Sequence, residues 1–271
     1  MTFTGKASAA VLGLILLSSL LAPLFWPIDP DEIDLDSIRR PPSAAHPLGT
    51  DSKGRDVFAR VLHGGKLSLA ISFSSAALSI AIGLCVGLVS GYFGGRIDTA
   101  CMAAADLVLS FPALLLAIGI SVLFPPGVYT VLLALAAFGW ASFARLIRGH
   151  VLTLREAPFI EAARALGCSR LRILLRHLLP QCGQLAITLA ALRVGGYLLT
   201  ESALSFLGLG AQPPTATWGS MISANRVFIS SAPWTALAPS FMIGLTVLSL
   251  NLLGDDLRSA FGGAGENVRV G

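Results

Sequence analysis

The sequence predicts an all-α membrane protein, and its composition carries this prediction. Of the 271 residues, 54% are apolar and only 13% are charged, and the mean hydropathy is +0.76. Soluble domains contain about 25% charged residues. The apolar residues also form long blocks separated by polar segments, which is typical of a bundle of membrane-spanning helices. We therefore expect one polytopic helical bundle.

Six stretches are long and apolar enough to cross a membrane, which takes about 20 residues. We expect these spans at residues 9–26, 67–93, 99–124, 128–147, 181–207 and 234–253. A cleaved signal peptide is the alternative for the first stretch, because Lys6 precedes an apolar run that ends in small residues. A span is favoured, since the run is longer than an ordinary signal sequence and reaches Trp26, a residue suited to the membrane interface.

The cations predict the orientation of these spans. The connection between spans four and five holds only two acids against seven arginines: Arg145, Arg148, Arg155, Arg164, Arg170, Arg172 and Arg176. Such a connection belongs in the cytoplasm, and both termini then face the cytoplasm as well. The segment 27–66, which holds six cations, falls outside and conflicts with this rule. The longer basic connection decides the orientation. The net charge of +4 is interpreted as a signal of membrane topology, so no nucleic-acid partner is expected.

The chain divides into three parts on this basis. Residues 1–66 form the first span and an external segment, in which the helical spacing of Val57, Phe58, Val61 and Leu62 predicts an amphipathic helix lying at the surface. Residues 67–261 form a core of five spans with a cytoplasmic loop at 155–180. Residues 262–271 form a cytoplasmic C-terminal tail.

The loop at 155–180 predicts two short helices joined by a sharp turn. Gly167 stands where a glycine in the left-handed conformation ends a helix, and Ser169 can cap the next helix, which runs to Pro180. On these residues alone, a hairpin resting on anionic lipid headgroups is an equal interpretation.

The spacing within this loop carries a family resemblance. Glu161-Ala162-Ala163, three residues, Gly167, nine residues and then His177-Leu178-Leu179-Pro180 resembles the EAA loop of ABC importer permeases, with His177 where the pattern has Ile. The blocks 46–69, 201–222 and 251–261 are similar to the second permease subunit of the dipeptide, oligopeptide and nickel transporter family.

This resemblance implies a type I ABC importer permease with six transmembrane helices in the cell inner membrane. The residues assigned by it to ATPase coupling are Glu161, Ala162, Ala163, Arg164, Gly167 and Pro180. The implied partners are a second homologous permease, two ATP-binding cassette ATPases, an external solute-binding protein and membrane lipid. ATP and Mg²⁺ belong on the ATPases, with no cofactor on this chain. Peptides are the expected cargo, and nickel or a metal chelate is the alternative.

An enzyme is not expected. The glycine-containing segment 49–56 lacks the Lys and Ser/Thr that end a phosphate-binding loop, and no GxSxG or HExxH motif occurs. The four cysteines form no CxxC pair and the four histidines are scattered, so neither a disulfide framework nor a metal site is expected.

Three ionisable residues fall well inside the expected spans, away from their ends: Asp106, Arg193 and Glu201. Charges within lipid mark functional candidates, here for the translocation path or a subunit interface, although Asp106 and Glu201 also fit structural roles. Arg193 and Glu201 are about 12 Å apart along a helix and should not pair. If Asp106 and Glu201 relayed protons, the chain would be an ion-gradient-driven secondary transporter, which is the main alternative, and a non-transporting scaffold is a third. Small residues at four-residue spacing, Gly83, Gly87 and Gly91, predict close packing of helices.

Overall fold

The protein is an all-helical bundle in the computed structural model, which describes residues 2–266. The described part of the chain contains no strand, only an isolated bridge between Thr50 and Asp56. Its elements are α1 (Phe3–Leu20), α2 (Ala22–Phe25), η1 (Leu35–Ser37), α3 (Val57–Phe93), α4 (Gly95–Leu109), α5 (Ala113–Leu123), α6 (Val128–Arg155), α7 (Pro158–Ala165), α8 (Arg170–Ile173), η2 (Leu174–Leu178), α9 (Leu179–Phe206), α10 (Trp218–Asn225), η3 (Arg226–Phe228) and α11 (Trp234–Glu266).

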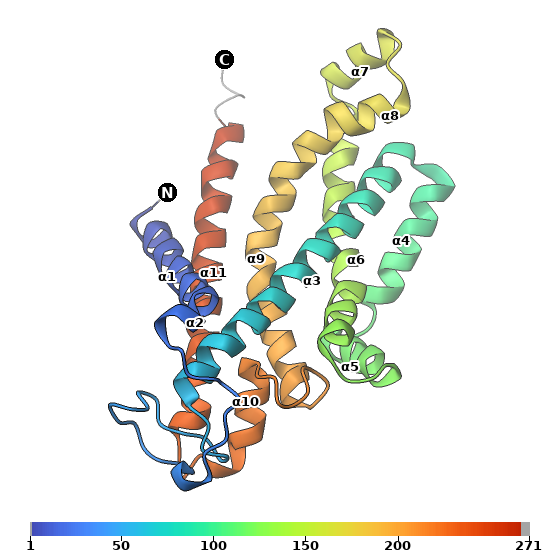
Figure 1. Cartoon of the computed structure of the whole chain (residues 1–271). Coiled ribbons are helices and arrows are strands. Elements are labelled where there is room, and N and C mark those ends of the chain that lie inside the picture. The colour runs from blue at the N-terminus through green and yellow to red at the C-terminus, as the bar shows by residue number, and fades with distance from the viewer. Residues whose placement is uncertain (1, 267–271) are drawn as a thin grey trace.

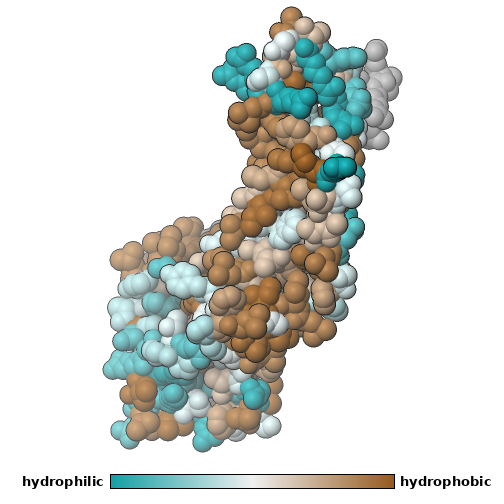
Figure 2. All heavy atoms as spheres, turned by 90° about the vertical axis from the view of Figure 1, so that its right-hand side faces the viewer, coloured by the Kyte–Doolittle hydropathy of each residue, from teal (hydrophilic) through white to brown (hydrophobic). Residues whose placement is uncertain are grey.

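The helices form an elongated bundle with a different cap at each end. Helix α3 crosses the bundle diagonally, with α1 and α11 on one side and α4, α5 and α6 on the other (Figure 1). The short helices α7 and α8 project from one end, where α11 also finishes, while α10 and the segment 27–56 cover the opposite end. In Figure 2 hydrophobic side chains dominate the middle of the visible face, and hydrophilic ones gather at its two ends. This distribution is that of a membrane-embedded protein.

Six spans result when each bent helix pair counts as one. Four helices are long and apolar enough to cross a membrane alone, namely α1, α3, α6 and α11 as far as Ser259. Helices α4 and α5 make a fifth span with a 90° bend, and the segments Arg170–Gly183 and Leu185–Phe206 make a sixth with a 46° bend.

The expected boundaries need three corrections. The first span begins at Phe3 and ends at Leu20, six residues earlier than expected at each end, because Thr2 caps α1 and accepts a hydrogen bond from the Gly5 amide. Residues 57–66 are not a separate surface helix; they form the first turns of α3 and are mostly buried. Five residues of the expected tail, 262–266, continue α11, and residues 267–271 lie outside the described residues.

Two prolines act differently from expectation. Pro112 splits the expected third span, since it ends the hydrogen-bond ladder between α4 and α5. Pro180 does not end the second helix of the loop, which runs through η2 directly into α9. In η2 the chain forms π-type hydrogen bonds, including Leu179 N–H to the Leu174 carbonyl. This wider turn carries the helix past the proline, which has no amide donor.

The most extensive helix contact lies between α3 and α6, and three glycines bring the two helices close together. A β-carbon at Gly83 would lie 2.8 Å from the Trp140 carbonyl oxygen, and one at Gly87 would lie 2.7 Å from that of Ala144. At Gly91 the nearest atom would be Val151 Cβ at 2.8 Å. The expected glycine packing is thus found within the subunit, where the absence of side chains brings the two backbones together.

Candidate functional site

The predicted two-helix hairpin is present and its turn has the expected geometry. Gly167 has φ +76°, its amide donates to the Arg164 carbonyl, and the Cys168 amide donates to that of Ala163, both at 3.0 Å. These two bonds form a Schellman motif, which closes α7 and requires a residue that adopts positive φ at low cost. Ser169 then caps α8 by accepting from the Arg172 amide at 3.3 Å. The turn is defined by local hydrogen bonds.

The inner face of the hairpin is fixed to the bundle. Ile160 is fully buried and Ala163 is 6% exposed. Both belong to one apolar cluster with Leu88 of α3, Ile147 of α6 and Leu178 of η2. The apolar residues of α7 thus share one buried cluster with residues of α3, α6 and η2, and close packing of this cluster opposes movement of α7 relative to them.

Two arginines tie the hairpin to the end of α3. The Arg155 guanidinium donates to the Gly91 carbonyl at 3.3 Å, and that of Arg164 donates to the Arg155 carbonyl at 3.3 Å. Arg164 also lies over the Tyr92 ring, 5.9 Å from its centroid, a distance at which the cation and the ring attract. Arg164 is therefore engaged with its own chain, although it remains exposed.

The outer face of the hairpin is open. Glu161, Ala162 and Gly167 are exposed, and Leu166 is 84% exposed at the tip. Of the six residues named for coupling, Ala163 faces inward and Pro180 lies in the first turn of α9, away from this face. These residues are not covered by the described part of the chain, so this surface of the hairpin is free to contact another protein.

A second group of candidates lies on the face shared by α4, α6 and α9. Asp106 of α4 forms a close ion pair with Arg145 of α6, and both side chains are more than half exposed. Nearer to the hairpin, the Asp98 carboxylate of α4 accepts two hydrogen bonds from the Arg148 guanidinium of α6, at 2.5 and 2.6 Å. Sequence reasoning did not find these pairs, since their members lie 39 and 50 residues apart and nothing local links them.

Arg193 stands alone on the same face. It lies near the middle of α9, about 20 Å from either end, and it has no hydrogen-bond or ion-pair partner among the side chains that the structure describes. It borders a cavity of about 220 Å³ that is also lined by Ser142, Gly196, Tyr197 and Thr200. A lone arginine in hydrocarbon costs at least about 2.5 kcal/mol.

Glu201 has a different environment, although it is on the same helix. It is fully buried, and its carboxyl accepts from Ser205 at 2.8 Å and from Ser202 at 3.4 Å. The Ser68 hydroxyl of α3 also lies beside the Glu201 carboxyl, and it accepts a hydrogen bond from the Trp218 amide at 3.1 Å. As expected, Arg193 and Glu201 do not pair; Glu201 is held by hydroxyl groups where α3, α9 and α10 meet.

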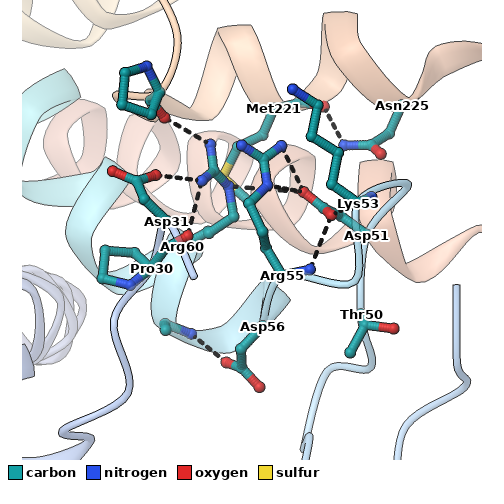
Figure 3. A network of polar contacts seen from close by, with 12 residues as sticks. Pro30, Asp31, Thr50, Asp51, Lys53, Arg55, Asp56, Arg60, Met221 and Asn225 are labelled. Carbon is teal, nitrogen blue, oxygen red and sulfur yellow. Dashed lines mark hydrogen bonds and ion pairs between the residues drawn. The ribbon is translucent and has the colours of Figure 1, made fainter. Parts of the chain in front are cut away.

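The opposite end of the molecule is locked by an ionic network that sequence reasoning missed (Figure 3). Arg60, at the start of α3 and 5% exposed, donates to the Asp31 carboxylate at 2.6 Å, to the Pro30 carbonyl at 2.8 Å and to the Pro214 carbonyl at 3.3 Å. Beside it, Arg55 and Asp51 form a buried pair at 2.7 Å. Arg60 thus joins the segment 27–56 to the connection between α9 and α10.

The described residues contain no group of three or more His, Cys, Asp or Glu side chains that could hold a metal ion. The cysteines at 85, 101, 168 and 182 are all free thiols.

Comparison with solved structures shows the fold. The chain resembles the inward-facing methionine ABC transporter MetNI with a TM-score of 0.60 and 19% identity, covering 74% of this chain and 95% of that one. The fold is that of a type I ABC importer permease.

Comparison with sequences shows the family. The family model described as the inner membrane component of binding-protein-dependent transport systems matches residues 83–262. The chain is 42% identical to the glutathione transport system permease protein GsiD of Pectobacterium atrosepticum, over 95% of this chain and 87% of the relative. It is 41% identical to the dipeptide transport system permease protein DppC of Alkalihalophilus pseudofirmus, over 94% and 86%. The chain therefore belongs to the binding-protein-dependent inner membrane components, the permease subunits of ABC importers.

Proposed function

We propose that this permease belongs to an ATP-driven importer of dipeptides or oligopeptides. Relatives that are 41–42% identical over nearly the whole chain are named for glutathione and dipeptide transport, and both cargoes contain peptide bonds. In this proposal a second homologous permease pairs with the chain, two ATP-binding cassette ATPases bind at the hairpin end, and an external solute-binding protein delivers the cargo. ATP and Mg²⁺ bind to the ATPases, so this chain hydrolyses nothing itself.

The hairpin is the observation that carries the proposal. Its inner residues Ile160 and Ala163 are buried against α3, α6 and η2, while Glu161, Ala162 and Leu166 are exposed outside the bundle. A surface that is open to a partner and joined through a buried apolar cluster to α3, α6 and η2 can transmit a partner's movement. We assign α7 as the coupling helix, with Gly167 holding its end and Pro180 starting the helix that leads into the membrane.

The orientation follows from the same assignment. The hairpin, the start of α1 and the end of α11 lie on the cytoplasmic side of the inner membrane, where the arginines of residues 145–176 favour that side. The segment 27–56 and α10 then form the external cap, locked by Arg60, and this cap is the surface available to a solute-binding protein.

The translocation path is assigned to the face that carries Asp106, Arg145 and Arg193. Charged side chains are tolerated within a membrane where they face a water-filled cavity, and these three do not face the apolar core of the bundle. Glu201 is assigned a structural role, because hydroxyl groups enclose it. The ion-gradient alternative loses support, since Asp106 is already paired with Arg145 and Glu201 is sealed from solvent.

Two substitutions in the hairpin test the coupling role. Glu161→Lys reverses an exposed charge, and Gly167→Pro cannot adopt φ +76°; both should abolish uptake in reconstituted vesicles while the chain still inserts and assembles with the second permease. Glu32→Lys is the matched control, because Glu32 is exposed at the opposite end of the molecule, and it should leave ATPase binding unchanged. Normal uptake in both hairpin variants would defeat the coupling assignment.

Vesicles that contain this chain alone separate the leading proposal from the alternative. Under the proposal they should take up no peptide with or without an ion gradient, and uptake should appear only when the ATPases, the second permease, the binding protein and ATP are all present. Gradient-driven uptake by this chain alone would contradict it. Binding of nickel, and not of peptide, to the cognate solute-binding protein would favour the metal alternative.

A further inference from the structure

The charges on the face of α4, α6 and α9 are unequally neutralised. Helix α4 offers two carboxylates, and both are taken: Asp106 pairs with Arg145, and Asp98 pairs with Arg148. Arg193 is the third arginine on this face and is left without a carboxylate within the described part of the chain. Its positive charge is therefore available to something outside this chain.

The surroundings of Arg193 are hollow and hydroxyl-bearing. The adjoining cavity of about 220 Å³ lies between α9, α6 and the start of α5, where Ala113 and Phe138 also line it. A β-carbon at Gly196 would meet no atom within 4 Å, so the wall is open there. Because Arg193 is about 20 Å from either end of α9, its side chain cannot reach a membrane surface. The exposed guanidinium is then open, within the membrane, to water, to a solute or to a group of a partner subunit.

The hydroxyl groups complement the guanidinium. Thr200 donates to the Gly196 carbonyl at 2.9 Å, and Ser142 donates to the Gly139 carbonyl at 3.1 Å. A hydroxyl that already donates keeps its lone pairs for an incoming N–H. The guanidinium offers a planar fork of donors that fits a carboxylate. One small cavity thus presents donors for an anion and acceptors for N–H groups.

We propose that this cavity is a carboxylate-binding station for the transported molecule, and that the cargo therefore carries a free carboxylate next to N–H groups, as a peptide does. The inference rests on the proposed function, since it places α9 on the translocation path. The same positive charge repels a bare divalent cation, so unchelated nickel is a poor cargo for this path. An acidic residue of the partner permease would also neutralise Arg193, but a permanent pair would occupy the space that the hydroxyl groups line.

Chemical labelling tests the station without any cargo. In the assembled complex of the two permeases and the two ATPases, with the four native cysteines of this chain replaced by alanine, Ser142→Cys places a thiol on the cavity wall opposite Arg193. We expect an anionic methanethiosulfonate to react roughly tenfold faster than a cationic one, relative to their rates with a free thiol, because of the nearby positive charge. Adding Arg193→Gln should return the ratio to that of the free thiol, and Arg193→Lys should keep most of it.

Gly149→Cys in the same complex is the control, because Gly149 is exposed on α6 nearer to the hairpin. The ratio of anionic to cationic labelling rates at this thiol should not respond to Arg193→Gln. An unchanged ratio in Ser142→Cys after Arg193→Gln would overturn the station. Failure of the Ser142→Cys thiol to react with either reagent, whether the complex is ATP-bound or nucleotide-free, would also overturn it. Dissociation of the two permeases by Arg193→Gln would overturn it as well, because it would indicate that Arg193 makes a subunit contact.

Labelling in the presence of a tripeptide separates this inference from the proposed function. Ala-Ala-Ala should slow labelling of Ser142→Cys at least fivefold, whereas its C-terminal amide, which lacks the carboxylate, should not; equal protection by both would overturn the carboxylate assignment. If the wild-type complex imports no tripeptide but the Arg193-dependent labelling preference holds, the peptide cargo is wrong and the anion station stands. If import is normal and the preference is absent, the station is wrong and the proposed function stands.

Discussion

Replacing Gly87 with alanine tests whether the close contact between α3 and α6 determines the stability of the bundle. The added β-carbon would lie 2.7 Å from the Ala144 carbonyl oxygen and 2.7 Å from Ile147 Cβ. Ordinary contact begins at 3.4 Å, and neither atom can rotate away because one is backbone and the other is fixed to it. The two helices must therefore separate by several tenths of an ångström along their seam.

The magnitude follows from two opposing effects. Overpacking of a well-packed interface costs about 1–3 kcal/mol, while alanine is favoured over glycine in a helix by about 1 kcal/mol. Gly149→Ala is the matched control, since it lies on α6 and a β-carbon there meets no atom within 4 Å. Both variants gain the same helix propensity, so the difference between them isolates the packing cost of about 1–3 kcal/mol.

Thermal denaturation of the purified complex is the assay. The Gly87 variant should denature about 2–10 °C below the Gly149 variant. The ATPase activity of the complex that contains it should also respond less to the loaded binding protein, because the contact between α3 and α6 joins the hairpin to the bundle. Equal midpoints for the two variants would show that α3 and α6 tolerate separation, and the argument from close packing would fail.

Substitutions at three further positions probe other parts of the molecule. Trp218→Phe removes the donor that bonds the Val61 carbonyl at 2.9 Å in a fully buried site, and it should cost about 1–3 kcal/mol in thermal denaturation; unchanged stability would contradict the bond's role. Arg60→Met releases Asp31 and should speed proteolysis of segment 27–56 in the folded complex, whereas a resistant segment would mean that other contacts hold it. Gly167→Asn should retain more transport than Gly167→Val, since asparagine enters the left-handed region more easily, and the reverse order would exclude a conformational cause.

The local features of the hairpin could be predicted because they depend on neighbouring residues. Gly167 and Ser169 act through hydrogen bonds to residues within a few positions, and both took their expected roles. The approximate places of the spans follow from apolar length for the same reason. Coupling by Glu161 remains a prediction, since it concerns another protein.

The features that were missed depend on contacts between distant segments. The bend at Pro112 lies within a stretch that is predominantly apolar on both sides of the proline, so a count of apolar residues is insensitive to it. The spacing of Val57 and Val61 is that of a half-buried helix, which fits burial against α10 as well as it fits a membrane surface. The pair of Asp98 with Arg148 joins two helices and has no local sequence signal.

Helix α3 has a length that links events on the two sides of the membrane. Its 37 residues extend for about 55 Å, whereas the hydrocarbon core is about 30 Å thick. One end is bound through Arg60 to the segment 27–56, and the other carries the Gly91 carbonyl to which Arg155 donates beside the hairpin. Helix α3 therefore joins the two ends of the molecule directly, and a contact made at the cap and a contact made at the hairpin act on opposite ends of the same helix.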